Sequence, residues 1–247
     1  YLLGSPIYFN NVEFLCTGDA RASGLNIQNC GKHIEVIDCS FTNMKLRTNG
    51  LISPLCLVSN GEDEDFIFTG LTFTNCYGTN LRCFSLSAHK PFTFSNVTVK
   101  DNTLGNYLGQ INLGGHATST DVFLFDNCKW YRNKCNSQFG GGAGLWLVNN
   151  KIQCTFAFQD CTFEENSHTD KGGALQDGDS ASVATKILQF KDCTFNNNAA
   201  PSGGALAIET VLPFSIDGCT FTNNNANNAQ SSEVRTNGGG AIYINTN

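Results

Sequence analysis

Charged residues are scarce in this chain. Asp, Glu, Lys and Arg make up 15% of its 247 residues, against about 25% in an average soluble domain. The 15 Lys and Arg are scattered and the net charge is -6, so no basic stripe is present for a nucleic-acid backbone. No apolar run is long enough to cross a bilayer. We therefore expect neither a nucleic-acid partner nor a transmembrane segment.

Residues that favour helices are also sparse. Amphipathic helices usually expose Glu, Lys and Arg, whereas the polarity here comes from 30 Asn and 22 Thr, beside 25 Gly and 19 Phe. None of these four residue types is a good helix former. The abundance of Phe, Leu, Ile and Val argues equally against a disordered chain. The composition therefore predicts an ordered protein that is not helical.

Closely spaced cysteine pairs are absent, although the chain has 12 cysteines. The shortest separation between two cysteines is seven residues, which disfavours a structural zinc site built on CxxC pairs. A high and even cysteine count is typical of proteins from oxidising compartments. The chain begins at Tyr1 without a signal peptide, so we expect a mature secreted product or part of a longer protein.

One short pattern recurs along the whole chain. It reads apolar, any residue, Asn/Asp/Gly, apolar or Cys, polar, aromatic or apolar, as in FQDCTF at Phe158 and FKDCTF at Phe190. Its fourth position, which we call the anchor, recurs every 26 to 33 residues, at Val12, Cys39, Leu71, Val97, Cys128, Cys161, Cys193 and Cys219. The chain is therefore built from eight repeats of about 30 residues.

Each position of the pattern has a structural interpretation. The third position holds only residue types that enter left-handed backbone conformations easily, at Asn11, Asp38, Gly70, Asn96, Asn127, Asp160, Asp192 and Gly218. We expect a bend there. The apolar fourth and sixth positions flank a polar fifth, which predicts a short strand with one buried face. A second strand precedes the bend, and a third begins at Gly-rich segments such as GGAL at Gly203.

Three short strands per repeat fit one coil of a parallel β-helix. The expected fold is therefore all-β, a parallel β-helix of about eight coils that forms a single domain over residues 1–247. Coils spaced by about 4.8 Å would give a rod roughly 40 Å long. Such a rod has two open ends, so we expect it to continue into further polypeptide or to associate end to end with another subunit.

Two further motifs accompany the later repeats. They are GGA followed by Leu or Ile, at Gly172, Gly203 and Gly239, and Phe-x-x-Asn, at Phe163, Phe195 and Phe221. Over residues 160–247 these motifs resemble the repeats of the chlamydial-type polymorphic outer membrane proteins. The resemblance implies a right-handed parallel β-helix of the pectate-lyase-like class and an extracellular stalk or adhesive surface, with no catalytic motif to carry over. The first half departs from the motif, because FTNM at Phe41 and FTNC at Phe73 lack the final Asn.

A polysaccharide lyase or hydrolase is the alternative, since parallel β-helices also carry such enzymes. A glycosidase would need two or three carboxylates on neighbouring coils. The nearest cluster is Asp177 with Asp179, which a plain turn explains better, and the acidic run at 62–65 fits a solvated loop. The four histidines occupy unrelated repeat positions, at His33, His89, His116 and His168. We therefore expect no catalytic residues, no metal site and no cofactor.

Two arrangements are open for the cysteines. Those at the anchor position would stack in the core about 5 Å apart, where they could be thiols or disulfides; we favour thiols, at Cys39, Cys128, Cys161, Cys193 and Cys219. A recurring offset of seven residues instead suggests local disulfides, and Cys16 with Cys30 could form another. The offset pairs are Cys76 with Cys83, Cys128 with Cys135, and Cys154 with Cys161. The two arrangements compete at Cys161.

One glycosylation sequon, Asn96-Val97-Thr98, falls on the bend position. An Asn selected for its backbone geometry explains Asn96 equally well. The sequence as a whole predicts a non-catalytic, extracellular structural or adhesive β-helix, as part of a cell-surface coat, appendage or filament. A carbohydrate-binding or carbohydrate-active β-helix is the alternative, and glycans are possible partners in either case.

Overall fold

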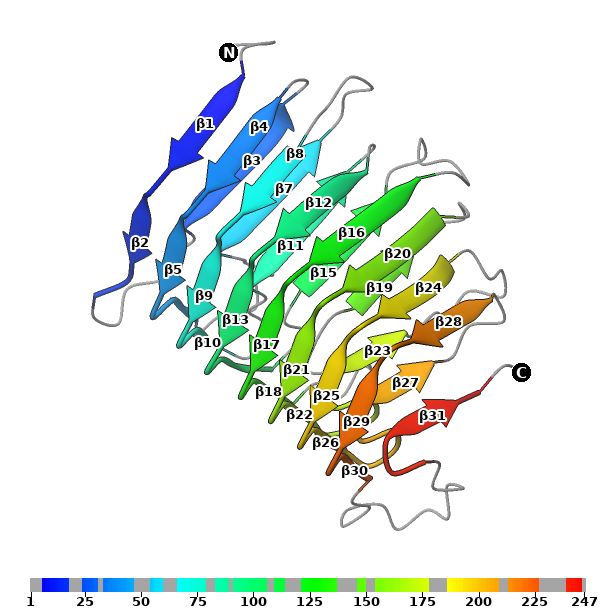
Figure 1. The fold of residues 1–247 in the computed structure, drawn as a ribbon. Coiled ribbons are helices and arrows are strands. Elements are labelled where there is room, and N and C mark those ends of the chain that lie inside the picture. The colour runs from blue at the N-terminus through cyan, green and yellow to red at the C-terminus, as the bar shows by residue number, and fades with distance from the viewer. Residues whose placement is uncertain are drawn as a thin grey trace.

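The computed structural model describes residues 6–17, 24–30, 33–46, 54–59, 66–78, 83–88, 91–105, 109–113, 121–136, 146–149, 154–177, 186–208, 213–226 and 239–245. These residues form a parallel β-helix, whose coils stack along one axis (Figure 1). The first strands and the last strands lie at opposite ends of the stack (Figure 1). The fold class expected from the sequence is therefore confirmed.

Four parallel sheets run along the axis, and we number them in the order in which the chain visits them. The first sheet contains β1 (Ile7–Asn10), β4 (Ile34–Ile37), β8 (Phe66–Thr69), β12 (Phe92–Ser95), β16 (Val122–Asp126), β20 (Cys154–Gln159), β24 (Lys186–Lys191) and β28 (Phe214–Asp217). The second sheet contains β2 (Glu13–Leu15), β5 (Ser40–Thr42), β9 (Thr72–Thr74), β13 (Thr98–Lys100), β17 (Lys129–Tyr131), β21 (Thr162–Glu164), β25 (Thr194–Asn196) and β29 (Thr220–Thr222).

The two remaining sheets complete each coil. The third sheet consists of two-residue strands, β6 (Lys45–Leu46), β10 (Tyr77–Gly78), β14 (Thr103–Leu104), β18 (Lys134–Cys135), β22 (Ser167–His168), β26 (Ala199–Ala200) and β30 (Asn225–Ala226). The fourth sheet contains β3 (Leu25–Cys30), β7 (Leu55–Ser59), β11 (Phe84–Ala88), β15 (Gly109–Leu113), β19 (Trp146–Asn149), β23 (Leu175–Asp177), β27 (Leu206–Ile208) and β31 (Ile242–Ile244).

Every coil turns at one left-handed residue, and every coil after the first turns at a second one. The first bend, between the first and second sheets, has φ angles of 48° to 65°, at Asn11, Asp38, Gly70, Asn96, Asn127, Asp160, Asp192 and Gly218. The second bend has φ angles of 50° to 58°, at Asn43, Asn75, Asp101, Arg132, Glu165, Asn197 and Asn223. It leads into the third sheet, so a coil has four strands where the sequence indicated three. Two-residue strands leave no visible alternation of polar and apolar residues, which is why that sheet was missed.

Aromatic rings stacked along the axis fill the core. In the second sheet the ring centroids of Trp130 and Phe163 are 4.6 Å apart and those of Phe163 and Phe195 are 4.8 Å apart, and the ring planes are nearly parallel in both pairs. The first sheet carries a parallel column, in which Phe125 and Phe158 are 4.8 Å apart. These separations equal the spacing of strands within a sheet. The inward sixth position of the repeat therefore forms a continuous stack, interrupted only at Val99 within the described coils.

A ladder of buried asparagines follows the second bend. Its members are Asn102, Asn133, Asn166, Asn198 and Asn224, of which the first four are fully buried. The side-chain oxygen of Asn102 accepts from the backbone N–H of Cys76 one coil earlier. Each later oxygen accepts from both the backbone N–H and the Nδ2 of the asparagine one coil earlier, at 2.9 to 3.2 Å. Each Nδ2 also donates to a carbonyl of the preceding coil, at 2.8 to 3.2 Å. Because an amide has two donors and one carbonyl acceptor, the ladder satisfies every inner member completely.

The two glycines of the GGA motif have different roles. Gly172 and Gly203 have φ angles of 60° and 58°, which favour glycine. A Cβ on Gly204 would lie 2.3 Å from the carbonyl oxygen of Gly240 and 2.5 Å from the nitrogen of Asn225. Asn225 directly follows the Asn of the Phe-x-x-Asn motif, and Gly173 approaches Ala199 in the same way. The two motifs therefore occur together because they touch across neighbouring coils.

We expect Gly204→Ala to destabilise the chain by about 2 kcal/mol, because the added methyl meets rigid backbone atoms rather than movable side chains. Gly240→Ala is the matched control, since a Cβ there comes no closer than 3.7 Å to any described atom. Urea unfolding monitored by circular dichroism measures both variants. Equal stability of the two variants would contradict the assigned role of the close contact.

Asn166→Ala removes the partner of three buried groups, namely the backbone N–H and the Nδ2 of Asn133 and the carbonyl of Trp130. Since each buried group left unsatisfied costs about 1–3 kcal/mol, we expect a loss of roughly 3 kcal/mol or more. The control is Asn136→Ala, at an exposed position after β18. The same unfolding measurement applies, and a loss for Asn166→Ala as small as that of the control would rule out the ladder as a source of stability.

Candidate functional site

The cysteines of the anchor position form one continuous column in the later coils. The thiol of Cys161 lies within hydrogen-bonding reach of Cys128 on one side and of Cys193 on the other. The sulfur of Cys219 accepts a hydrogen bond of 3.4 Å from the backbone N–H of Cys193. Cys39 belongs to the same anchor position, but its neighbours on adjacent coils are Val12 and Leu71. The structure thus brings together four of the five anchor cysteines.

Backbone carbonyls engage these thiols. The Sγ of Cys161 lies 3.3 Å from the carbonyl of Phe125 and 3.2 Å from that of Gln159, and Cys193 repeats the arrangement one coil later. The hydrogen bond from Cys128, together with burial, raises the pKa of the Cys161 thiol well above its usual range. The thiolate is the reactive form of cysteine. The raised pKa disfavours the thiolate of Cys161, and the column resembles the asparagine ladder in contacting backbone carbonyls.

The local cysteine pairs have different outcomes. Cys76 and Cys83 are fully buried, and their thiols are joined by a side-chain hydrogen bond, which lowers the pKa of Cys76. Cys154 and Cys161 cannot pair, because Cys154 begins β20 and Cys161 lies beyond its end. The six-residue strand alone covers about 16 Å, whereas a disulfide requires Cα atoms no more than about 7 Å apart.

The other two predicted pairs are Cys128 with Cys135 and Cys16 with Cys30. Cys128 faces its neighbour Cys161 in the anchor column. Cys135 lies in β18, where its partners along the third sheet are Leu104 and His168. The pair of Cys128 and Cys135 is thus divided between two columns. Cys16 is buried at the end of β2, and the side chain of Cys30 lies outside the described residues.

The sequon residue Asn96 is exposed at the first bend, with a φ of 57°. Its side-chain oxygen accepts a hydrogen bond of 2.7 Å from the Nδ2 of Asn127 one coil later. The geometry therefore assigns Asn96 a structural role in the bend and leaves its amide nitrogen at the surface, where a glycan would attach. Glycosylation of Asn96 stays a prediction.

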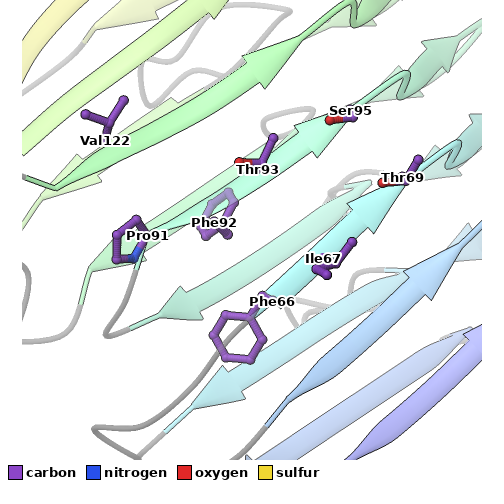
Figure 2. A pocket seen from close by; sticks show the side chains of 8 residues that line it. All are labelled: Phe66, Ile67, Thr69, Pro91, Phe92, Thr93, Ser95 and Val122. Carbon is purple, nitrogen blue, oxygen red and sulfur yellow. The ribbon is translucent and has the colours of Figure 1, made fainter.

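An open pocket lies on the outer face of the first sheet, over β8, β12 and β16 (Figure 2). Three hydroxyl side chains and three outward apolar ones line it, above the core rings of two phenylalanines: Phe66, Ile67, Thr69, Pro91, Phe92, Thr93, Ser95 and Val122. No carboxylate, histidine or cysteine is among these residues. The pocket can offer hydroxyl groups and apolar contacts to a neutral polar ligand, but it has no pair of carboxylates for glycoside hydrolysis.

Two of the remaining candidate residues are described, and they lie on different strands and have separate partners. His168 is buried in β22, where its Nδ1 accepts from the backbone N–H groups of Asp170 and Lys171, and burial lowers its pKa to about 4. His33 pairs with Glu35 at 2.6 Å. The other candidates lie outside the described residues; they are His89, His116, Asp179, residues 62–65 and the side chain of Asp177.

Within the residues that the structure describes, no group of three or more His, Cys, Asp or Glu side chains is placed to hold a metal ion. Over the same part of the chain, no helix has the length and apolar character needed to cross a membrane.

Comparison with known proteins agrees with the motifs and the fold. A curated protein, metabotropic glutamate receptor-like protein P of Dictyostelium discoideum, is 31% identical over 117 residues. The aligned segment covers 47% of this chain, which spans only 7% of the length of that protein. No solved structure matches the chain.

Residues 192–209 and 218–245 match the family model of the Chlamydia polymorphic membrane protein repeat. These residues contain the GGA motifs at Gly203 and Gly239 and the Phe-x-x-Asn motifs at Phe195 and Phe221. The chain is therefore a parallel β-helix whose C-terminal coils are similar to the repeat of the Chlamydia polymorphic membrane proteins.

Proposed function

We propose that this chain is a non-catalytic, rod-like segment of a cell-surface protein, with a structural or adhesive role outside the cell. The observation that carries the proposal is the match of its C-terminal coils to a membrane-protein repeat, on a fold whose ladders continue from coil to coil. The Dictyostelium relative, named as receptor-like, supports a surface location.

The outer face of the second sheet supports an adhesive role. Its outward fifth position is Ser or Thr in six of eight coils, at Ser40, Thr72, Thr98, Thr162, Thr194 and Thr220. The in-register pairing lines these hydroxyls up along the rod. A rigid row of hydroxyl groups presents both donors and acceptors to a partner without having to be ordered on binding.

The two ends of the rod support its extension. Apolar core residues of the first described coil are only partly buried, among them Phe9 and Phe14, and so are Ile216 and Phe221 in the last. The same positions are fully buried in the inner coils. We propose that each end pairs with a further coil, contributed by the same polypeptide or by another subunit, because an open sheet edge is a template for pairing.

A carbohydrate-binding role is the second candidate, and the open pocket on the first sheet is the observation that favours it. The hydroxyls of Thr69, Thr93 and Ser95 lie beside the apolar side chains of Ile67 and Val122. Such a mixture suits the polar edges and apolar faces of a sugar.

An extracellular location predicts a disulfide between Cys76 and Cys83, whose thiols already touch. The two thiols would lose two protons and two electrons to a disulfide donor of the secretory pathway, and one S–S bond would form. Peptide mapping of the native protein by mass spectrometry, with alkylation before reduction, should find this pair linked and Cys161 and Cys193 alkylated only after unfolding. A link between Cys161 and Cys193 would overturn the assignment of the anchor column as thiols.

Antibodies against this chain should label intact source cells without permeabilisation, because the proposal places the rod outside the cell. Immunoelectron microscopy of the same cells should show labelled rods longer than the roughly 40 Å that eight coils would give. An antibody against a cytosolic protein is the control for cell integrity. Labelling that requires permeabilisation would reject the surface role.

A further inference from the structure

Four cationic side chains gather on two adjacent coils of the rod. We call Lys100, Lys129, Arg132 and Lys134 the cationic cluster; they lie on β13, β17, the second bend and β18. The cluster holds four of the 15 Lys and Arg of a chain whose net charge is -6. Charge is scarce on this protein, so a local group of one sign is a departure from its general pattern.

Strand register places Lys100 and Lys129 on the outer face of the second sheet, and Arg132 and Lys134 follow on the bend and strand that come next in the chain. Lys100 pairs with Tyr131 across the β13–β17 ladder, and Lys129 lies two residues from Tyr131 on the same face of β17. Lys129, Arg132 and Lys134 are exposed. Among the described residues, no hydrogen bond or ion pair engages the ammonium groups of Lys129 and Lys134. Both side chains are therefore available to a partner.

The guanidinium of Arg132 is held in a fixed orientation. Its Nε and Nη2 donate to the two carboxylate oxygens of Asp101 at 2.6 and 3.0 Å. Its central carbon lies 3.9 Å from the centre of the Tyr131 ring. This arrangement leaves the Nη1 group outside the pair with Asp101. Arg132 thus presents a preorganised donor at the centre of the cluster, at little entropic cost on binding.

Carboxylates surround part of the cluster. Asp101 pairs with Arg132, and the hydrogen bond from Arg132, with the charges of Arg132 and Lys100, lowers the pKa of that carboxyl. Glu164 borders Tyr131 on the next coil and accepts a hydrogen bond of 3.0 Å from Asn196, and Asp126 borders the cluster at the end of β16. Glu165 is exposed at the second bend of the next coil, where it follows Arg132 in the column. Lys129 and Lys134, which no carboxylate of the described residues engages, are therefore the cations that can pair with an anionic partner.

Hydroxyl groups flank the cluster along the axis. Lys129 pairs with Thr98 on the preceding coil and with Thr162 on the following coil. A partner lying across these strands would meet a hydroxyl, an ammonium and another hydroxyl at steps of about 4.8 Å. That step is comparable with the length of one sugar residue in a chain. The ring face of Tyr131 that Arg132 covers is closed to the base stacking on which single-stranded nucleic acids depend.

From this juxtaposition we propose that the cationic cluster, with Thr98 and Thr162, is a binding site for an acidic polysaccharide that carries carboxylate or sulfate groups. The cations pair with the acidic groups, and the threonines bind the sugar hydroxyls. The inference rests on the proposed adhesive function and names the partner of that surface. Binding can be measured on the isolated chain, so its failure would leave the surface location untouched.

The test is binding of the full 247-residue chain to immobilised heparin, as the sulfated probe, and to polygalacturonate, as the carboxylate probe. Dextran is the neutral control, and single-stranded DNA is the phosphate control. The test variant is Lys129→Glu with Lys134→Glu, and the matched control is Lys191→Glu, an exposed lysine on β24 in the first sheet. Thermal unfolding should be the same for both variants and the unaltered chain, because all three lysines are exposed.

We expect the unaltered chain and Lys191→Glu to bind at least one acidic polysaccharide, more weakly as salt is added. The double variant should bind the same polysaccharide with an affinity lower by a factor of about ten or more. Binding to heparin but not to polygalacturonate would identify sulfate as the recognised group. The reverse result would identify carboxylate. The proposal is overturned if neither is bound, if the double variant binds as well as Lys191→Glu, if DNA binds as tightly, or if dextran does, which would point to the open pocket instead.

Discussion

In-register stacking of equivalent residues is the constraint on which this structure depends. Neighbouring coils pair through parallel ladders, so each side chain meets its counterpart about 4.8 Å along the axis. A column of this kind favours residues that satisfy one another: rings that stack, as from Phe163 to Phe195, and amides that donate and accept at once, as from Asn166 to Asn198. Like charges placed one above the other repel. The scarcity of charge in the sequence is therefore a consequence of the fold.

The interior contains polar groups without destabilising the coils, because the columns distribute hydrogen bonds along the axis. The asparagine ladder satisfies backbone N–H and carbonyl groups at the second bend, and the anchor thiols contact carbonyls at the first. Each column consequently stabilises one of the two left-handed bends. The GGA motif completes the coil by letting the fourth sheet approach the residue that follows the ladder asparagine. Bends, ladders and close contacts thus form one connected system, and a change in one coil is felt by its two neighbours.

Much of the fold could be predicted from the sequence, and the features that the sequence did not indicate have physical causes. The first bend was visible because Asn, Asp and Gly tolerate positive φ. The second bend was not, because Arg132 and Glu165 occupy left-handed positions in which neither is usual, and the packing of the coil outweighs local preference. Asn102 and Asn133 belong to the ladder although no Phe precedes them at the motif distance. The pairing of Cys154 with Cys161 was wrong because equal sequence offsets say nothing about the extended strand that separates the two cysteines.

The same constraint indicates where a partner would be recognised. When the repeat accounts for the interior, an outward residue that follows the column pattern is explained by stacking alone, as are the threonines of the second sheet. A departure from the pattern requires another explanation. Lys129 stands in a column of hydroxyl residues, and Arg132 stands at a bend where asparagine would suffice. Neither residue is explained by stability, because Arg is strained at positive φ and an exposed lysine adds little to the free energy of unfolding. Residues that the scaffold does not need, close together in one coil, are the part of this rod that distinguishes it from a neutral spacer.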